Sequence, residues 1–267
     1  MAITIDACFA QHLGDRKEQQ DRVAIFAHPK VKGVALAVVA DGMGGHTGGV
    51  LAAEQVVHTA KTNLAHFSPQ EDTPQHMLEN SMLEAHTMIK ASRCINEKDP
   101  HSTAVMMLIQ PGKLSWGHCG DSRLYRFRGD KMAFRTTDHS YVEHLLATGK
   151  ITPEQAATHQ YRNVLLTSLG GGESPKFTFG ECAEVAAGDS YLLCSDGLWG
   201  YFEEAELGGV IAAFSAREAC EILIQRARDR GRGEGDNCSL VIVKFKETEK
   251  PAQSQRFTPP FRGNSKL

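Results

Sequence analysis

The sequence lacks a long apolar run, a strong excess of charge of either sign, and any repeated spacing of cysteine. The formal net charge of −3 gives the chain no overall attraction for nucleic acid or an anionic membrane. No apolar run approaches the roughly 20 residues of a membrane span, and Asp6 stands where a signal peptide would carry basic residues. We therefore expect a cytoplasmic, monomeric protein with no nucleic-acid or membrane partner.

The seven cysteines are odd in number, are scattered along the chain and never occur as C-x-x-C. This distribution disfavours a disulfide framework or a zinc knuckle, and it favours a reducing compartment. Cys119 and Cys194 lie within strand-like apolar runs. We expect both to be buried as small hydrophobic residues.

The composition is that of an ordinary globular domain. Hydrophobic residues make up 41% and charged residues 23% of the sequence, as is usual for a soluble globular protein. The length of 267 residues is ample for a buried core. No long linker or internal repeat interrupts residues 1–250, so we expect one domain there. Residues 251–267 hold three prolines, three basic residues and no acidic residue. They predict a flexible C-terminal tail, with a docking tail as the alternative.

Apolar periodicity predicts a layered α+β fold in which strands alternate with pairs of helices. Thr73-Pro74 and Ser215-x-x-Glu218 are typical helix starts. The order of the elements predicts a four-layer α-β-β-α sandwich of two antiparallel sheets flanked by helices. The predicted strands are 23–26, 34–40, several within 103–134, 177–179, 191–194 and 239–245; the predicted helices are 50–67, one from 73 onward, 203–214 and 215–230.

A polar, helical pattern interrupts the strands between Asp138 and Leu166. Ser140-x-x-Glu143 fits a capping box, and Thr152-Pro-Glu-Gln155 fits a second one with proline at the first helical position. The turn Thr148-Gly-Lys150 would join two short helices. We expect a flap at about residues 140–166.

Four apolar runs each abut an aspartate that is followed by glycine, serine or asparagine: Asp41, Asp121, Asp196 and Asp236. Short runs bounded by turn residues predict buried strands, so these carboxylates would lie at the rim of a sheet. A single Asp-Gly is more often a plain turn. Four such aspartates, and three glycines within 41–46, favour carboxylates that converge on a hard metal ion.

Carboxylates without a nearby histidine or cysteine pair select Mg²⁺ or Mn²⁺ rather than Zn²⁺. Asp41, Asp196 and Asp236 are the core of this hypothesis, and the Gly42 carbonyl could join them. Two ions about 4 Å apart would activate a water molecule as a nucleophile. The same ions would neutralise phosphate oxygens, so the arrangement suits phosphoryl transfer.

At these residues the chain resembles the metal-dependent serine/threonine protein phosphatases of type 2C, in their bacterial branch. The resemblance covers about residues 5–245. The motifs that carry it are Arg16-Lys-Glu-Gln-Gln-Asp21, Asp41-Gly-Met-Gly-Gly-His46, Gly120-Asp-Ser-Arg123, Thr137-Asp-His-Ser140, Ser195-Asp-Gly-Leu-Trp199 and Gly235-Asp-Asn237.

The resemblance implies a role for each matched residue. Asp41 would bridge two metals, with the Gly42 carbonyl on one ion and Asp196 and Asp236 on the other. Asp121 would hold a third, weaker metal together with Asp196. Two further residues complete the implied site: Arg16 would bind the substrate phosphate, and Asp21 would orient the attacking water.

Four residues depart from the family pattern. Gln20 replaces a metal-binding glutamate of some relatives, and Gly200 replaces a further aspartate. Met43 occupies the place of a histidine proposed elsewhere as the general acid. His101 stands where the family usually has glycine.

Other candidate residues have alternative interpretations. For His46, a role as the general acid and a structural role in the loop are equally expected. His139 is expected to cap or pack the flap rather than catalyse. Trp199 is expected as a core anchor, and Arg123 as the partner of a carboxylate at a strand end, with substrate contact as the alternative. The basic run 226–232 suits the end of a helix better than nucleic acid.

The resemblance predicts hydrolysis of phosphoserine and phosphothreonine in proteins by an activated water, without a phosphoenzyme. Two Mn²⁺ or Mg²⁺ ions would be needed, with a possible third. The phosphorylated partners would include a bacterial serine/threonine kinase or its substrates. Two alternatives are a catalytically weak or inactive binding module with the same fold, and a different metal hydrolase such as a nuclease, which would need a basic groove.

Overall fold

The computed structural model describes residues 3–93, 99–172 and 174–248, apart from the side chains of His46 and Thr47. The predicted tail, 251–267, lies outside the described residues. The strands are β1 (Ile3–His12), β2 (Arg22–Ala27), β3 (Ala35–Ala40), β4 (Gly42–Met43), β5 (His101–Ser102), β6 (Ala104–Gln110), β7 (Lys113–Cys119), β8 (Arg123–Arg128), β9 (Lys131–Arg135), β10 (Thr178–Cys182), β11 (Asp189–Cys194) and β12 (Cys238–Glu247). The helices are α1 (His46–His66), α2 (Pro74–Ser92), α3 (Tyr141–Ala147), α4 (Pro153–Ala157), α5 (Asp196–Trp199), α6 (Glu204–Ala213) and α7 (Ala216–Gly231).

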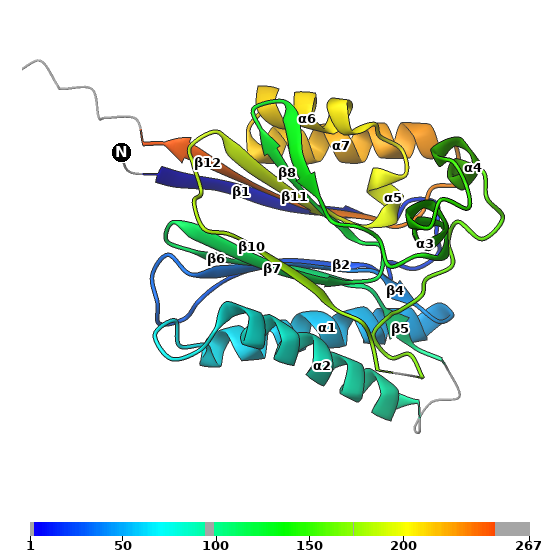
Figure 1. Cartoon of the computed structure of the whole chain (residues 1–267), viewed down its shortest axis with the longest axis horizontal. Coiled ribbons are helices and arrows are strands. Elements are labelled where there is room, and N and C mark those ends of the chain that lie inside the picture. The colour runs from blue at the N-terminus through cyan, green and yellow to red at the C-terminus, as the bar shows by residue number, and fades with distance from the viewer. Residues whose placement is uncertain (1–2, 94–98, 173, 249–267) are drawn as a thin grey trace, which may run out of the picture.

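Two five-stranded sheets lie face to face, with helices on both outer faces (Figure 1). We name the sheets by their strand orders: sheet A is β1-β12-β11-β8-β9, and sheet B is β10-β7-β6-β3-β2. All strand pairs within them are antiparallel. Helices α6 and α7 cover sheet A, and α1 and α2 cover sheet B (Figure 1). The predicted four-layer sandwich is confirmed.

The apolar runs form strands that are buried on both faces, and β3 shows how alternate residues serve two cores. Leu36, Val38 and Ala40 pack against α1 and α2. Ala37 and Val39 point the other way and pack between the two sheets. Because successive strand residues face opposite sides, an uninterrupted apolar run is what a strand in the middle of such a sandwich needs.

Helix α1 begins four residues before the predicted start at Val50. The predicted start was later because the apolar residues on which it rests begin at Leu51. Gly49 lies inside the helix, where a Cβ would come within 2.6 Å of the Gly42 carbonyl oxygen. Because glycine has no side chain, the two backbone segments can pack closely at this point, and the helix continues through Gly49.

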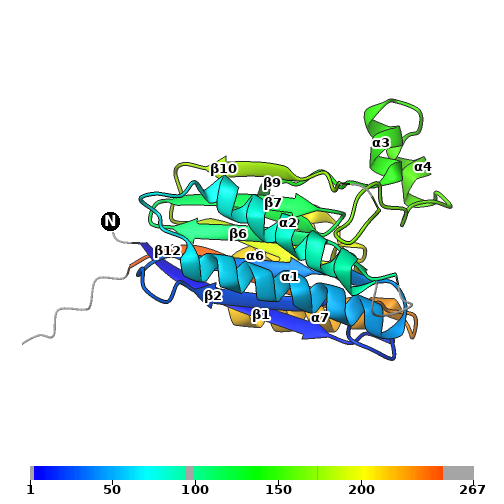
Figure 2. The ribbon, with the colours of Figure 1, turned by 90° about the horizontal axis from the view of Figure 1, so that it is seen from below.

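The two short helices predicted within residues 140–166 form as α3 and α4, and this segment, which we call the flap, projects beyond the body of the sandwich (Figure 2). Ser140 caps α3 by accepting the amide of Glu143 at 3.3 Å. Thr152 and Gln155 form both halves of the capping box of α4.

None of the helices in the described part of the chain has the length and the apolar composition that spanning a membrane requires.

Candidate active site

The two sheets bring five aspartates to the same end of the sandwich. Asp21, Asp41 and Asp121 adjoin the ends of β2, β3 and β7 in sheet B. Asp196 follows β11 and Asp236 precedes β12, both in sheet A. The acidic cluster, as we call these five residues, is therefore shared between the two sheets.

Burial and mutual repulsion raise the pKa of Asp21, Asp41, Asp121 and Asp196. Burial, reinforced by Asp21 and Asp196, raises the pKa of Asp41 well above its usual range. Burial likewise raises the pKa of Asp121 to about 8, that of Asp21 to about 7 and that of Asp196 to about 6. A hydrogen bond from Asp41 lowers the pKa of Asp196 and offsets part of this effect. At neutral pH these carboxylates therefore cannot all carry their charge without cost, and a bound cation would offset that cost.

Arg16 lies at the solvent side of the acidic cluster. Its guanidinium forms an ion pair of 2.7 Å with Asp236, and the two side chains are 59% and 40% exposed. Arg16 also lowers the pKa of Asp196, so it is close to that carboxylate as well. A solvent-facing guanidinium beside buried carboxylates is placed to meet an incoming anion.

Asn237 holds the loop that carries Arg16, a role that sequence reasoning missed. Its amide nitrogen donates to the carbonyls of Leu13 and Glu18 at 2.8 and 3.0 Å. Its amide oxygen accepts the backbone N–H of Gln20 at 2.7 Å. The position directly after Asp236 was the only signal in the sequence, because the partners lie more than 200 residues away.

Backbone contacts hold Asp41 in place. Its N–H donates to the Thr103 hydroxyl at 3.0 Å, and its carbonyl accepts the Thr103 N–H at 2.8 Å. Asp21 accepts the Ser195 hydroxyl at 2.7 Å, which links sheet B to sheet A. These bonds involve buried groups and therefore define the direction of each carboxylate.

The oxygen donors fit a hard divalent cation, because Mg²⁺ and Mn²⁺ prefer carboxylate and carbonyl ligands and a cation would offset the repulsion within the acidic cluster. In the described part of the chain, no three acidic, histidine or cysteine side chains are arranged so that they could hold a metal ion as they stand. The carboxylates are held by the Asp41–Asp196 hydrogen bond and the Arg16–Asp236 ion pair. The Gly42 carbonyl packs against Gly49 at the edge of the cluster.

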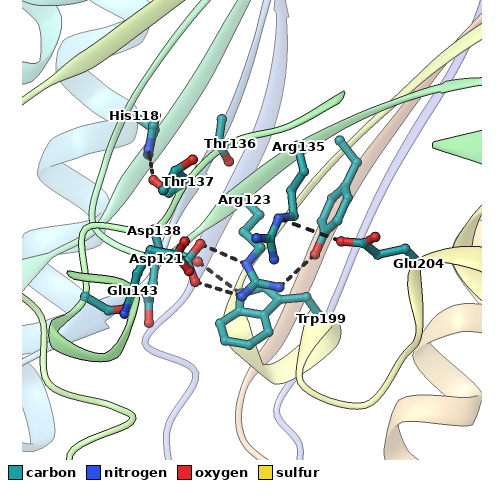
Figure 3. A network of polar contacts seen from close by, with 12 residues as sticks. His118, Asp121, Arg123, Arg135, Thr136, Thr137, Asp138, Glu143, Trp199 and Glu204 are labelled. Carbon is teal, nitrogen blue, oxygen red and sulfur yellow. Dashed lines mark hydrogen bonds and ion pairs between the residues drawn. The ribbon is translucent and has the colours of Figure 1, made fainter. Parts of the chain in front are cut away.

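A polar network supports Asp121 from one side (Figure 3). Arg123 binds both carboxylate oxygens of Asp138, at 2.8 and 2.7 Å, and its guanidinium lies 3.5 Å from the centre of the Trp199 ring. The indole N–H of Trp199 donates to the Asp121 carbonyl at 3.0 Å. The predicted pairing of Arg123 with a carboxylate is confirmed, and Trp199 positions the loop of Asp121 in addition to packing against the core.

The other candidate residues have structural surroundings. His139 stacks on His118 with ring centres 4.5 Å apart and meets the Thr178 hydroxyl at 2.9 Å, as expected for packing the flap. His101 lies opposite Met43 in the β4–β5 pair and contacts Ser168 at 3.2 Å. The His46 side chain lies outside the described part.

The remaining candidates are also placed by local packing. A Cβ at Gly200 would meet the Asp196 carbonyl at 3.0 Å. Cys119 and Cys194 are buried as predicted. In the basic run, Arg226 and Arg230 form ion pairs with Glu206 of the neighbouring helix.

Comparison with known proteins agrees with this geometry. The family model described as Protein phosphatase 2C matches residues 10–236. The chain belongs to the protein phosphatase 2C family. The predicted family is therefore confirmed, and its motifs lie at the ends of the strands in this 2C-family chain.

Named relatives of this 2C-family chain are bacterial. The serine/threonine phosphatase stp of Listeria innocua is 30% identical over 237 residues, which are 86% of this chain and 91% of that protein. The serine/threonine protein phosphatase PstP of Mycobacterium tuberculosis is 32% identical over 216 residues, or 79% of this chain. The match spans 40% of the length of PstP.

Solved structures of bacterial phosphatases share the 2C fold of this chain. The S. agalactiae serine/threonine phosphatase superposes with a TM-score of 0.82 at 27% identity, covering 90% of this chain and 99% of that one. The catalytic domain of PstP in complex with two manganese ions gives a TM-score of 0.76 at 28% identity, covering 92% and 100%.

Proposed function

We propose that this 2C-family protein hydrolyses phosphoserine and phosphothreonine in other proteins, with divalent cations bound at the acidic cluster. The observation that carries this proposal is the meeting of aspartates from both sheets beside the solvent-facing Arg16. The names of the relatives and the two manganese ions of PstP support it. The reaction is hydrolysis of a phosphoester, with water as the nucleophile and no residue of this chain forming a covalent intermediate.

Each residue of the site has a proposed role. Asp41, Asp196, Asp236 and the Gly42 carbonyl would hold two ions, and Asp121 with Asp196 a third, weaker one. When bound, Mn²⁺ or Mg²⁺ would supply an activated water and neutralise charge on the phosphate. The family resemblance implies these roles, and the oxygen donors and their shared position at one end of the sandwich support them.

Arg16 and Asp21 act on the substrate and the water rather than as ligands. The planar guanidinium of Arg16 can grip two phosphate oxygens, exchanging its exposed pairing with Asp236 for the substrate anion. Asp21 is buried and held by the Ser195 hydroxyl. Its carboxylate would orient the attacking water by a hydrogen bond.

We further propose that residues 1–250 form the catalytic domain of a monomer that acts in the cytoplasm. The six described cysteines are free thiols, which suits a reducing compartment. The proposed partners are phosphorylated proteins, including a bacterial serine/threonine kinase or its substrates. Either Mn²⁺ or Mg²⁺ suits the donor set.

The test is phosphate release from a phosphothreonine peptide, with Mn²⁺ and with a chelator, by wild type, Asp196→Asn and Asp130→Asn. Asp130 is an exposed aspartate in the β8–β9 turn and serves as the matched control. We expect metal-dependent release that Asp196→Asn reduces about 100-fold or more and that Asp130→Asn leaves unchanged.

Two results would contradict the proposed function. A folded wild type that binds the peptide and Mn²⁺ without turnover would identify a binding module. Metal-dependent cleavage of DNA, with the phosphopeptide untouched, would identify a nuclease.

A further inference from the structure

A cavity of about 720 Å³ lies between the edge strands of the two sheets and beneath the flap. One wall comes from β9, the last strand of sheet A, and the other from β10, the first strand of sheet B. Helix α3 of the flap contributes Glu143, His144 and Ala147. The volume falls within the range of sites that bind small molecules or short peptide segments.

The floor of the cavity is aromatic. The rings of Trp116 and Phe134 lie with their centres 5.2 Å apart. A Cβ at Gly180 would come within 2.6 Å of the Trp116 ring, so glycine allows the indole to lie across β10. Phe134 is 38% exposed, which leaves a large apolar surface open to the cavity.

Two neutral histidines, His118 and His139, stand in the wall toward the flap. His118 and His139 are stacked, and burial lowers the pKa of both imidazoles, that of His139 to about 4. The Nε2 of His118 meets the Thr137 carbonyl at 2.9 Å, so this nitrogen carries the proton. Two flat, uncharged rings therefore face the aromatic floor.

Charges of both signs stand around the cavity without a partner. Lys176, Glu143 and Glu181 line it, and none of them forms an ion pair with the described part of the chain. A ligand that carries charge of only one sign could not pair with all three of these side chains. A polypeptide offers an apolar side chain together with charged groups of both signs.

The cavity is separated from the acidic cluster by a short chain of contacts. Asp138 lines the cavity and binds Arg123, which lies over Trp199 (Figure 3). Trp199 donates to the Asp121 carbonyl, and Asp138 itself contributes to the raised pKa of Asp121. The cavity and the acidic cluster therefore adjoin the same network of Asp138, Arg123 and Trp199.

We propose that this cavity receives an aromatic side chain of the phosphoprotein substrate, a few residues from the phosphorylated residue. The inference rests on the proposed function. The floor of Trp116 and Phe134 stacks on the incoming ring, and the remaining volume takes the neighbouring main chain. Aromatic anchors in desolvated pockets carry much of the binding energy of peptide and protein contacts.

The experiment measures kcat/KM with Mn²⁺ for phosphothreonine peptides in which phenylalanine is moved through the flanking positions of a serine-rich background. p-Nitrophenyl phosphate, which has no flanking residues, is the reference substrate. The variants are Phe134→Ala and Met132→Ala. Both residues lie in β9 and are 38% exposed, but Met132 does not line the cavity.

We expect phenylalanine at one position, or at two neighbouring ones, to raise kcat/KM about tenfold over serine, the size of effect a hydrophobic pocket supplies. Phe134→Ala removes this gain, whereas Met132→Ala keeps it. Hydrolysis of p-nitrophenyl phosphate stays the same in both variants, because neither residue belongs to the acidic cluster.

The inference is overturned if no position shows a preference, if the gain survives Phe134→Ala, or if both variants lose it equally. In those cases the proposed function stands, since the peptides and the small ester are still hydrolysed. Absence of all metal-dependent hydrolysis would instead overturn the proposed function and this inference with it.

Discussion

At the scale of the residue, Asn237 shows how one side chain can organise a site without touching the substrate. Its three hydrogen bonds reach Leu13, Glu18 and Gln20, which flank Arg16 on both sides. Asn237 itself is anchored between Asp236 and β12 and is only 5% exposed. The position of Arg16, the arginine proposed to bind phosphate, is therefore set from a distant part of the sequence.

Asn237→Ala should loosen the loop of Arg16 and lower stability. The change leaves two carbonyls and one N–H without their partner, which costs about 2–4 kcal/mol in the free energy of unfolding. We expect a lower Tm and a higher KM for a phosphopeptide, measured by thermal unfolding and steady-state kinetics. Asn63→Ala is the control, because Asn63 also donates two hydrogen bonds but lies on α1. An unchanged KM in Asn237→Ala would show that the loop holds Arg16 by other means.

At the scale of the element, the start of β11 is tied to β8 by a buried carboxylate. Asp189 is fully buried and accepts hydrogen bonds from Arg126 at 2.8 Å and from Arg128 at 2.9 Å. It also accepts the Ala186 N–H at 3.1 Å. Burial alone would raise the pKa of Asp189, but these bonds hold the pKa below its usual value.

A carboxylate with a lowered pKa stabilises the fold above its pKa in the unfolded chain, which is about 3.9. The contribution is lost as the pH falls through the still lower pKa of the folded state. We expect Asp189→Asn to reduce the free energy of unfolding by about 2 kcal/mol at neutral pH, since the arginines are partly solvated. The difference from wild type should shrink below about pH 4, measured by urea unfolding across pH. A difference independent of pH would mean that packing, not charge, carries the effect.

The sequence predicts elements well where their causes are local. The caps at Thr73, Thr152 and Ser215 involve residues three apart and form as expected. The single-turn helix α5 and the bounds of β1 were not predicted, because the pattern of the first is too short and that of the second too mixed.

The features of the site likewise fall into those that the local sequence predicts and those that it does not. Four of its aspartates, Asp41, Asp121, Asp196 and Asp236, were predictable because each lies within two residues of a strand-like apolar run. Two other features depend on segments that are distant in the sequence. They are the hydrogen bonds from Asn237 to the loop of Arg16 and the cavity between β9 and β10. Local periodicity carries no information about either one.

At the scale of the whole molecule, the acidic cluster joins two sheets whose carboxylates repel each other. A cation bound there would hold both sheets at once, so binding should raise the stability of the entire domain. At a Mn²⁺ concentration 100 times its Kd the gain is about 2.7 kcal/mol, which is about 5–10 °C in Tm for a protein of this size.

We expect Mn²⁺ to raise the Tm of wild type by this amount and a chelator to reverse the shift. Asp196→Asn should lose most of the response, because it removes a proposed ligand contributed by sheet A. The measurement needs no substrate and is independent of activity. An equal shift in wild type and variant would place the ion elsewhere.

The division of the aspartates between the sheets also has a consequence for protein synthesis. Asp236 and Asn237 directly precede β12, the last strand of the fold, which inserts between β1 and β11. A chain still emerging from the ribosome, or one cut by a protease before this strand, lacks that carboxylate and the anchor of Arg16. Under the proposed function, incomplete copies of the chain would therefore not act on phosphorylated proteins, because the site is complete only when β12 has joined sheet A.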